Sequence, residues 1–287
     1  MKNERKLASS GFLYSELEFD SWTEMKAHFL NWRENYRYGT SYAFRGHSDS
    51  SWSLKPSLER IRPKIEENIF LNWYRKAEQL SVDRFKRAIH LYSNTKHLAP
   101  SDLSILDWLS TMQHYGAATR LLDVTFSPFI GAFFSISAIP MEITKIAIWA
   151  IPLERIDLIN IKTLGLVSDD PAQEVYDHYQ KLEIGLKDGT PIIGYSFLER
   201  PNERAFHQKG GFLYSMTSLE GFETTLKKYF QDEESGLIQF TLQIGSRGVL
   251  NDIINDLSML NISFGSLFPG VEGYSRETFM YQYIVNT

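Results

Sequence analysis

The chain has 287 residues, of which 43% are hydrophobic and 23% charged, and its net charge is −5. These values are typical of an ordinary folded protein and exclude a disordered polyelectrolyte, a collagen-like chain and a coiled-coil rod. The mild acidity disfavours a protein that coats nucleic acid with general basic charge. The absence of cysteine excludes disulfides, thiol nucleophiles and thiolate metal sites.

The first half of the sequence has the pattern of helices with one strand among them. Ser21 fits a helix start. A short strand over 42–44 is predicted to end at Arg45-Gly46. Further helices are predicted over 66–92, over 104–115 and, as a buried apolar segment, over 124–139. In the last segment, Ser127 and Pro128 are predicted to open the helix as its cap and first-turn proline.

The second half changes to strands. Alternating or continuous apolar runs predict strands over 146–151, 192–198, 211–216 and 237–244. Helices are predicted over 171–182, 249–260 and 271–284. The predicted class is therefore α+β: a helix-rich N-terminal half packs against a mainly antiparallel sheet from the C-terminal half plus one early strand. Residues 1–41 are expected to form an N-terminal helical extension, and residues 42–287 one compact unit.

The N-terminal twenty residues are charged and lack the apolar core of a signal peptide. The apolar segment over 124–139 is shorter than a bilayer crossing requires. We therefore expect a soluble, cytoplasmic protein with no membrane partner.

The first segment that points to chemistry is Phe44-Arg45-Gly46. An Arg at a strand end, followed by Gly, allows a guanidinium and a bare backbone to approach the same phosphate or carboxylate ligand. The alternative is an Arg paired with a carboxylate for structural reasons beside a turn glycine. Spacing alone favours that alternative.

The second segment contains Gln113-His114 and, shortly after it, Arg120 and Asp123. His114 has the chemistry of a general acid or base near neutral pH. Arg120 and Asp123 are three residues apart and would pair on one helical turn. The alternative is a structural polar cluster between helices, with His114 a satisfied core histidine.

The third and fourth segments lie in the second half of the chain. Residues suited to binding a sugar or a phosphate occur as Arg204, Gln208, Gly210, Gly211, Ser215 and Thr217. Glu272 and Glu277 follow as candidate carboxylates beside a loop. The alternatives are a tight turn into an ordinary strand and the usual acidic first turn of a helix.

Several other chemistries have no motif here. The seven histidines show no paired metal-ligand spacing, so no metal site is predicted. A carboxylate-coordinated magnesium site, which needs no tight spacing, stays open as an alternative. Walker, Gly-x-Gly-x-x-Gly and Gly-x-Ser-x-Gly motifs are also absent. P-loop, Rossmann-type redox and serine-hydrolase functions are therefore disfavoured.

These four segments, in this order, resemble the FRG domain, a bacterial family named after its Phe-Arg-Gly motif. The resemblance is carried by FRG at 44–46, QHYG at 113–116, TRLLD at 119–123, RAFHQKGGF at 204–212 and LFPGVEG at 267–273. It departs from the family pattern where Gly270 and Glu272 stand in place of Asp. The resemblance implies one FRG-like domain over most of the chain, and members of the family look like parts of toxin or phage-defence systems.

A looser resemblance is to the Arg, Ser and Glu order of ADP-ribosyltransferases. The matching positions are Arg45, the run 215–218, and Glu272 or Glu277. It implies that Arg45 binds a dinucleotide pyrophosphate and that a late Glu stabilises an oxocarbenium-like centre. Ser215 and Thr217 would orient the nicotinamide end, with the Gly210-Gly211 backbone against it. His114 and Arg120 would support these residues without touching the ligand themselves.

Three functions follow as hypotheses. The first is an ADP-ribosyltransferase or NAD glycohydrolase that takes NAD as its substrate. The second is a nucleotide-sensing module without turnover, in which Arg45, His114, Arg120, Arg204 and Gln208 converge on a phosphate-bearing ligand. The third is a nuclease or nucleic-acid-binding protein, which the acidic total disfavours.

Overall fold

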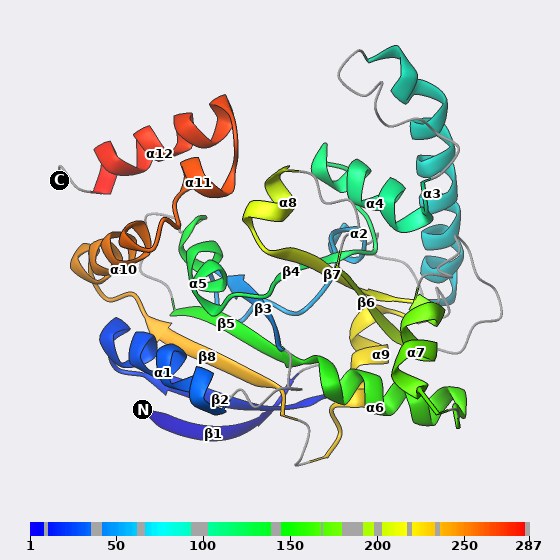
Figure 1. Cartoon of the computed structure of the whole chain (residues 1–287), viewed down its shortest axis with the longest axis horizontal. Coiled ribbons are helices and arrows are strands. Elements are labelled where there is room, and N and C mark those ends of the chain that lie inside the picture. The colour runs from blue at the N-terminus through cyan, green and yellow to red at the C-terminus, as the bar shows by residue number, and fades with distance from the viewer. Residues whose placement is uncertain are drawn as a thin grey trace.

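A computed structural model describes the chain over 1–8, 11–35, 42–61, 67–92, 103–138, 145–167, 169–179, 192–197, 203–216, 220–232 and 236–284. Within these ranges one eight-stranded sheet crosses the molecule, and helices cover both of its faces (Figure 1). The predicted α+β class is confirmed. Among the described helices, none combines the length and the apolar character that a bilayer crossing needs.

The sheet has the strand order β1-β2-β8-β5-β3-β4-β7-β6. Its strands, in that order, are Lys2–Leu7, Leu13–Phe19, Ile238–Gln243, Lys145–Pro152, Tyr42–His47, Leu122–Thr125, Gly210–Ser215 and Ile193–Phe197. The pair β2 and β8 is parallel, and every other neighbouring pair is antiparallel. The sheet is therefore mixed, and four of its strands come from the first 125 residues instead of the single early strand that was expected.

The two faces of the sheet bury different helices, as strand β5 shows. Ile146, Ile148 and Ala150 pack in one cluster, and Trp149 and Ile151 pack in another. This alternation is that of a central strand covered on both sides. The first cluster is shared with α1 (Trp22–Asn35), α5 (Pro128–Ile136), α10 (Arg247–Met259) and α11 (Phe264–Leu267). The second is shared with α6 (Leu153–Leu164) and α9 (Phe222–Tyr229).

A third apolar cluster extends the core beyond β7, and smaller elements complete the fold. The cluster contains residues of α3 (Glu67–Ala88), the short helix Ile89–Leu91, α4 (Ile105–His114) and α7 (Pro171–Tyr179). The remaining helices are α2 (Ser57–Arg60), α8 (Glu203–His207) and α12 (Val271–Ile284). Most of the predicted elements are confirmed within a few residues of their ends.

Two predicted segments were wrong. The N-terminal 41 residues are not a helical extension, because they contain β1 and β2 as well as α1, and β2 is hydrogen-bonded to β8. The apolar segment over 124–139 is not one helix. Its first residues belong to β4, and α5 begins only at Pro128. The predicted cap Ser127 and first-turn proline Pro128 are confirmed, and the Ser127 hydroxyl accepts a hydrogen bond from the Ile130 amide. The apolar character of that segment reflects burial of both elements, which periodicity does not separate in a short run.

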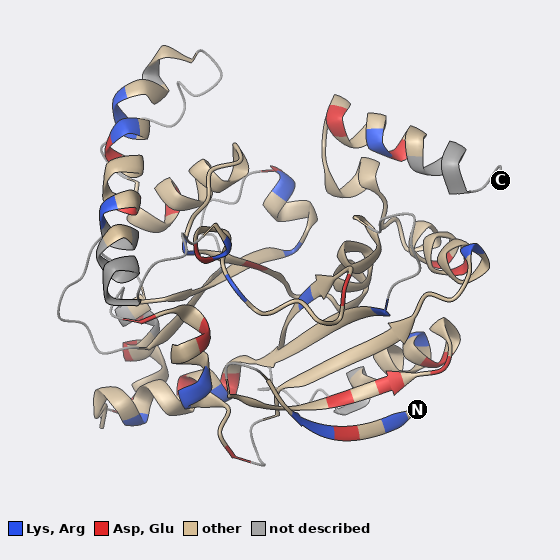
Figure 2. Ribbon diagram, turned by 180° about the vertical axis from the view of Figure 1, so that it is seen from behind, with Lys and Arg blue, Asp and Glu red and all other residues tan. Residues whose placement is uncertain are grey.

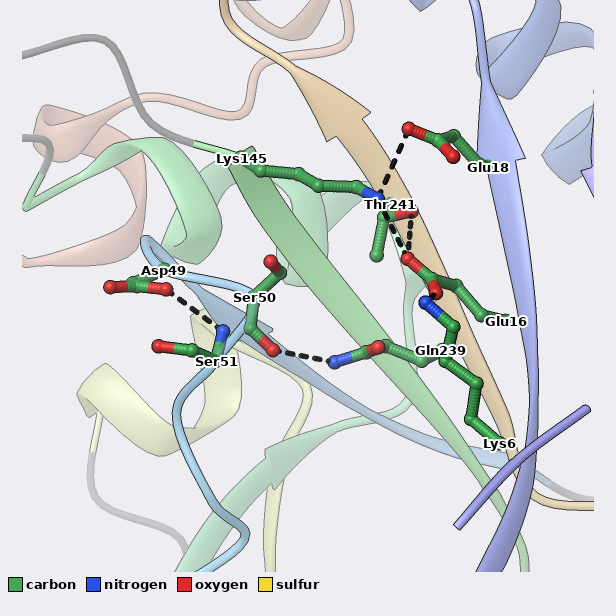
Figure 3. Close-up of polar contacts among 9 residues, drawn as sticks. All are labelled: Lys6, Glu16, Glu18, Asp49, Ser50, Ser51, Lys145, Gln239 and Thr241. Carbon is green, nitrogen blue, oxygen red and sulfur yellow. Dashed lines mark hydrogen bonds and ion pairs between the residues drawn. The ribbon is translucent and has the colours of Figure 1, made fainter. Parts of the chain in front are cut away.

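A buried carboxylate ties β1, β2, β5 and β8 together (Figure 3). The side chain of Glu16 on β2 is only 6% exposed. Its carboxylate forms ion pairs with Lys6 and with Lys145, whose Nζ lies 2.8 Å from it. The Thr241 hydroxyl donates a further hydrogen bond of 3.0 Å to it. Burial raises the pKa of Glu16, but the hydrogen bonds from Lys145, Lys6 and Thr241 outweigh this effect and hold the pKa below its ordinary value.

We expect Glu16→Gln to lower the free energy of unfolding by about 1–3 kcal/mol at pH 7, because it leaves two partly buried ammonium groups with weaker partners. A depressed carboxyl pKa stabilises the fold above the pKa of the unfolded chain and loses that contribution as the pH falls through the folded pKa. Wild-type stability should therefore fall in acid more steeply than that of the variant. Urea unfolding from pH 7 to pH 3 measures both effects.

Glu18→Gln is the matched control, since Glu18 also pairs with Lys145 but its side chain is 40% exposed. That change should cost less than about 1 kcal/mol. Parallel pH profiles for wild type and Glu16→Gln would contradict the prediction.

Candidate functional site

A pocket of about 280 Å³ is lined by residues of the strands β3, β4 and β7 and of the helices α4, α5 and α8. It brings together polar side chains that are far apart in the sequence: Arg45, Gln113, His114, Asp123, Arg204 and Gln208. Gly46, Gly210 and Gly211 also line it. The pocket thus gathers residues of three of the four segments that the sequence singled out.

Arg45 is fixed by two hydrogen bonds that leave part of its guanidinium unused. Its Nε donates to His47 Nε2 over 3.1 Å, and its Nη1 donates to the carbonyl oxygen of Asp123 over 2.6 Å. Burial lowers the pKa of Arg45, and the nearby Asp123 carboxylate opposes this shift, so the group stays protonated at neutral pH. Within the described part of the chain, Arg45 forms no ion pair with a carboxylate.

His47 helps to hold Arg45 in place by accepting its hydrogen bond, a role that the sequence did not suggest. Its imidazole is 4% exposed, and its ring contacts Trp52. Burial, followed by the positive charge of Arg45, lowers the pKa of His47 to about 3. A neutral imidazole accepts a hydrogen bond, whereas a protonated one would repel the guanidinium. The contact between the two residues therefore persists across the physiological pH range.

Asp123 presents a carboxylate to the pocket and is the main site residue that the sequence reasoning did not assign. Its Oδ1 accepts a hydrogen bond of 2.6 Å from Gln113 Nε2. The side-chain oxygen Oε1 of Gln113 accepts a hydrogen bond from the Thr119 hydroxyl. The oxygen of that hydroxyl in turn accepts a hydrogen bond of 3.1 Å from the Leu121 main-chain amide. On β4, Asp123 stands between buried Leu122 and Val124. That alternation is the sequence feature that points Asp123 away from the core.

The far wall of the pocket comes from α4 and α8. The guanidinium of Arg204 lies 4.4 Å from the ring centre of Phe268, at a distance suited to a cation–π contact. Burial lowers the pKa of His114, the positive charge of Arg204 lowers it further, and Glu272 acts in the opposite direction. His114 is therefore neutral at pH 7. Gln208 lines the pocket, but its amide donates to the Leu267 carbonyl over 3.0 Å and so connects α8 to α11.

Arg120 and Ser215 do not line the pocket. Arg120 is buried and its guanidinium binds both carboxylate oxygens of buried Glu78 on α3. Its Nη1 lies 3.3 Å from the carbonyl oxygen of Ser215, at the end of β7. The expected Arg120–Asp123 pair was wrong, because this segment leads into strand β4 and is not a helical turn.

The late glutamates are also engaged elsewhere. Glu272 is exposed at the start of α12 and pairs with Arg276 over 2.8 Å. Glu277 accepts hydrogen bonds from the Ser263 hydroxyl and the Gly265 amide and so joins α12 to α11. Thr217 lies outside the described residues. The structure therefore does not bring Ser215, Glu272 or Glu277 into the pocket beside Arg45.

Two of the pocket glycines are required by packing. A Cβ atom on Gly46 would lie 2.1 Å from the carbonyl oxygen of Gly131 and 2.5 Å from the Ser135 nitrogen, both in α5. A Cβ atom on Gly211 would lie 2.7 Å from the Phe126 ring. The absence of these side chains lets α5 and Phe126 approach the sheet, so the expectation that the glycines serve ligand approach is not needed to explain them.

Comparison with protein families gives one match, in which residues 40–142 fit the model of the FRG domain. The chain contains an FRG domain. Neither a curated protein nor a solved structure matches the chain. The matched residues supply β3, α4, β4 and α5, and therefore Arg45, Gln113, His114 and Asp123 of the pocket.

The remaining wall of the pocket lies outside the matched range of the FRG domain. Arg204, Gln208 and the two glycines of β7 come from residues 203–216, which the sequence analysis had included in the resemblance. β7 is hydrogen-bonded to β4, with Asp123 opposite Phe212. The pocket is thus completed by a strand and a helix that follow the FRG domain. Within the described ranges, no three His, Asp or Glu side chains gather closely enough to hold a metal ion.

Proposed function

We propose that the pocket binds a small phosphate-bearing ligand through Arg45 and Arg204. The observation that carries the proposal is that Arg45 and Arg204 both line one pocket, and neither forms an ion pair within the described residues. The Asp123 carboxylate offsets part of their charge, but the pocket lining holds two guanidinium groups and one carboxylate, which favours an anion. The planar donors of arginine match phosphate oxygens. Because the Asp123 carboxylate also lines the pocket, the lining is not purely cationic.

A small ligand is preferred to a nucleic acid because acidic and basic segments are interspersed along the described ribbon (Figure 2). A phosphate backbone needs an extended row of cations. The pocket instead offers two cations at one place. This arrangement supports a nucleotide-sensing module whose ligand stabilises the folded chain.

A second candidate is cleavage of NAD, which the looser resemblance to ADP-ribosyltransferases implies. It is favoured by one observation, the Asp123 carboxylate in the same pocket as the arginines. A carboxylate there would stabilise positive charge on a ribose carbon as nicotinamide leaves. Incubation with NAD, followed by mass spectrometry, tests this candidate through free nicotinamide. A chain that binds NAD without releasing nicotinamide is a sensing module.

Arg45→Ala tests the binding proposal directly. Loss of charge-assisted hydrogen bonds to phosphate is expected to raise the Kd for ADP about 10- to 100-fold. The melting temperature of the unliganded chain should change by only a few degrees, since Arg45 is half-buried and joins no apolar cluster. Isothermal titration calorimetry and thermal unfolding measure the two effects.

Arg84→Ala is the control for the loss of one positive charge, because Arg84 is exposed on α3 and does not line the pocket. It should leave ADP binding unchanged. If pyrophosphate, ADP and NAD all fail to bind the wild-type chain, the proposed function is wrong.

A further inference from the structure

We infer that Asp123 makes the pocket selective for a phosphate ester with free hydroxyl groups, of which the ribose phosphate of a nucleotide is the type, over inorganic phosphates. The inference rests on the proposed function. It concerns which phosphate-bearing molecule the pocket accepts, and it assigns Asp123 the role of a specificity-determining residue.

The Asp123 side chain is held in place before any ligand binds. Gln113 donates to Oδ1, and the Thr119 hydroxyl donates to the Gln113 carbonyl oxygen. Since Thr119 Oγ1 also accepts from the Leu121 amide, its proton is directed to Gln113, which turns the Gln113 NH₂ group towards Asp123. Such a chain fixes the position of the carboxylate at little further entropic cost on binding.

The Asp123 carboxylate can still accept hydrogen bonds from a ligand. Oδ1 receives the one side-chain hydrogen bond, and within the described residues Oδ2 receives neither a hydrogen bond nor an ion pair. Arg45 binds the main-chain carbonyl of Asp123 and leaves the carboxylate uncovered. An ionised carboxylate only accepts hydrogen bonds. It therefore attracts a ligand hydroxyl and repels a phosphate oxygen.

The group that binds the phosphate and the group that accepts the hydroxyl hydrogen bond lie close together. Because Arg45 Nη1 lies 2.6 Å from the carbonyl oxygen of Asp123, the anion-binding group and the hydroxyl acceptor belong to adjoining positions of one wall. A ligand that uses both must carry its phosphate and its hydroxyls within one small unit. The volume of about 280 Å³ is near the lower end of ligand pockets, which begin at about 300 Å³. It suits a sugar phosphate and leaves the rest of a larger nucleotide outside.

The test compares AMP with 2′,3′-dideoxy-AMP, which has the same base and phosphate but no ribose hydroxyls. Isothermal titration calorimetry on the wild-type chain should give a Kd about 10- to 100-fold lower for AMP, as expected for a hydrogen bond to a charged acceptor. Pyrophosphate is the third probe. Equal affinity of the wild-type chain for AMP and its dideoxy analogue would overturn the inference, and this arm needs no variant.

Asp123→Asn supplies the second arm, because it keeps the shape of the side chain and removes its charge. The variant should bind AMP more weakly and pyrophosphate more tightly than the wild type, so the two changes have opposite signs. Weakening of both ligands by the same factor would contradict the inference and show that Asp123 only supports the pocket. Failure of all three probes to bind the wild type would instead refute the proposed function, so the two failures are distinguishable.

Discussion

Arg120→Ala is expected to lower the free energy of unfolding by about 3–5 kcal/mol, the usual cost of removing one partner from a buried ion pair. Arg120 and Glu78 are both buried, and the guanidinium engages both carboxylate oxygens. Without Arg120, the Glu78 carboxylate would be left charged and uncompensated between α3 and the sheet. Chemical denaturation at pH 7 measures the loss.

The double variant Arg120→Met with Glu78→Leu should be more stable than Arg120→Ala, since it removes both charges and keeps apolar volume. Arg276→Ala is the matched control at an exposed ion pair, where the side chains are 53% and 61% exposed. It should change the stability by less than about 1 kcal/mol. A comparably small loss for Arg120→Ala would show that the buried pair contributes no more to stability than an exposed one.

Gly46→Ala is expected to cost about 3 kcal/mol or more, at or above the upper end of ordinary overpacking. The added methyl group would overlap main-chain atoms of Gly131 and Ser135. A helix backbone does not turn aside as a flexible side chain does, so α5 as a whole would have to move off β3. Thermal unfolding and the yield of folded protein measure this effect.

Gly245→Ala is the control, because no heavy atom lies within 4 Å of the added carbon there. That change should be neutral or slightly stabilising. If Gly46→Ala were equally neutral, the close contact between β3 and α5 would not exist. Displacement of α5 would also enlarge the pocket beside Phe134, so ADP binding should weaken in any Gly46→Ala chain that still folds.

The sequence predicted most of the elements and the convergence of distant segments on one pocket. Three segments are recognisable because their polar residues lie next to strands and glycines: Phe-Arg-Gly, Gln-His-Tyr-Gly and the segment from Arg204 to Gly211. Arg45, His114 and Arg204 do line one pocket. Spacing alone favoured a structural role for Arg45, and the resemblance of the ordered segments to the FRG domain is what pointed to them together.

Long-range partners could not be predicted from local pattern. Arg120 was assigned to Asp123, three residues away, but its partner Glu78 lies 42 residues earlier in the chain. The strand β1 was missed because it is almost wholly charged and polar, and β2 because it carries Glu16 and Glu18 among its apolar residues. Only the pairing of β2 with β8 shows its place in the sheet. Asp123 was passed over as a pocket residue because the helical interpretation of 119–123 hid its orientation.

The parallel pairing of β2 with β8 also sets an order of events during synthesis. Ser15 lies opposite Ile238, so the neighbour of this early strand is translated about 220 residues later, roughly 10 to 45 s at ordinary rates of elongation. Until then one edge of the N-terminal hairpin exposes main-chain groups without their final neighbour. The charges on Lys2–Leu7 and the carboxylates of β2 would discourage wrong pairing on a nascent chain that cannot yet close its sheet.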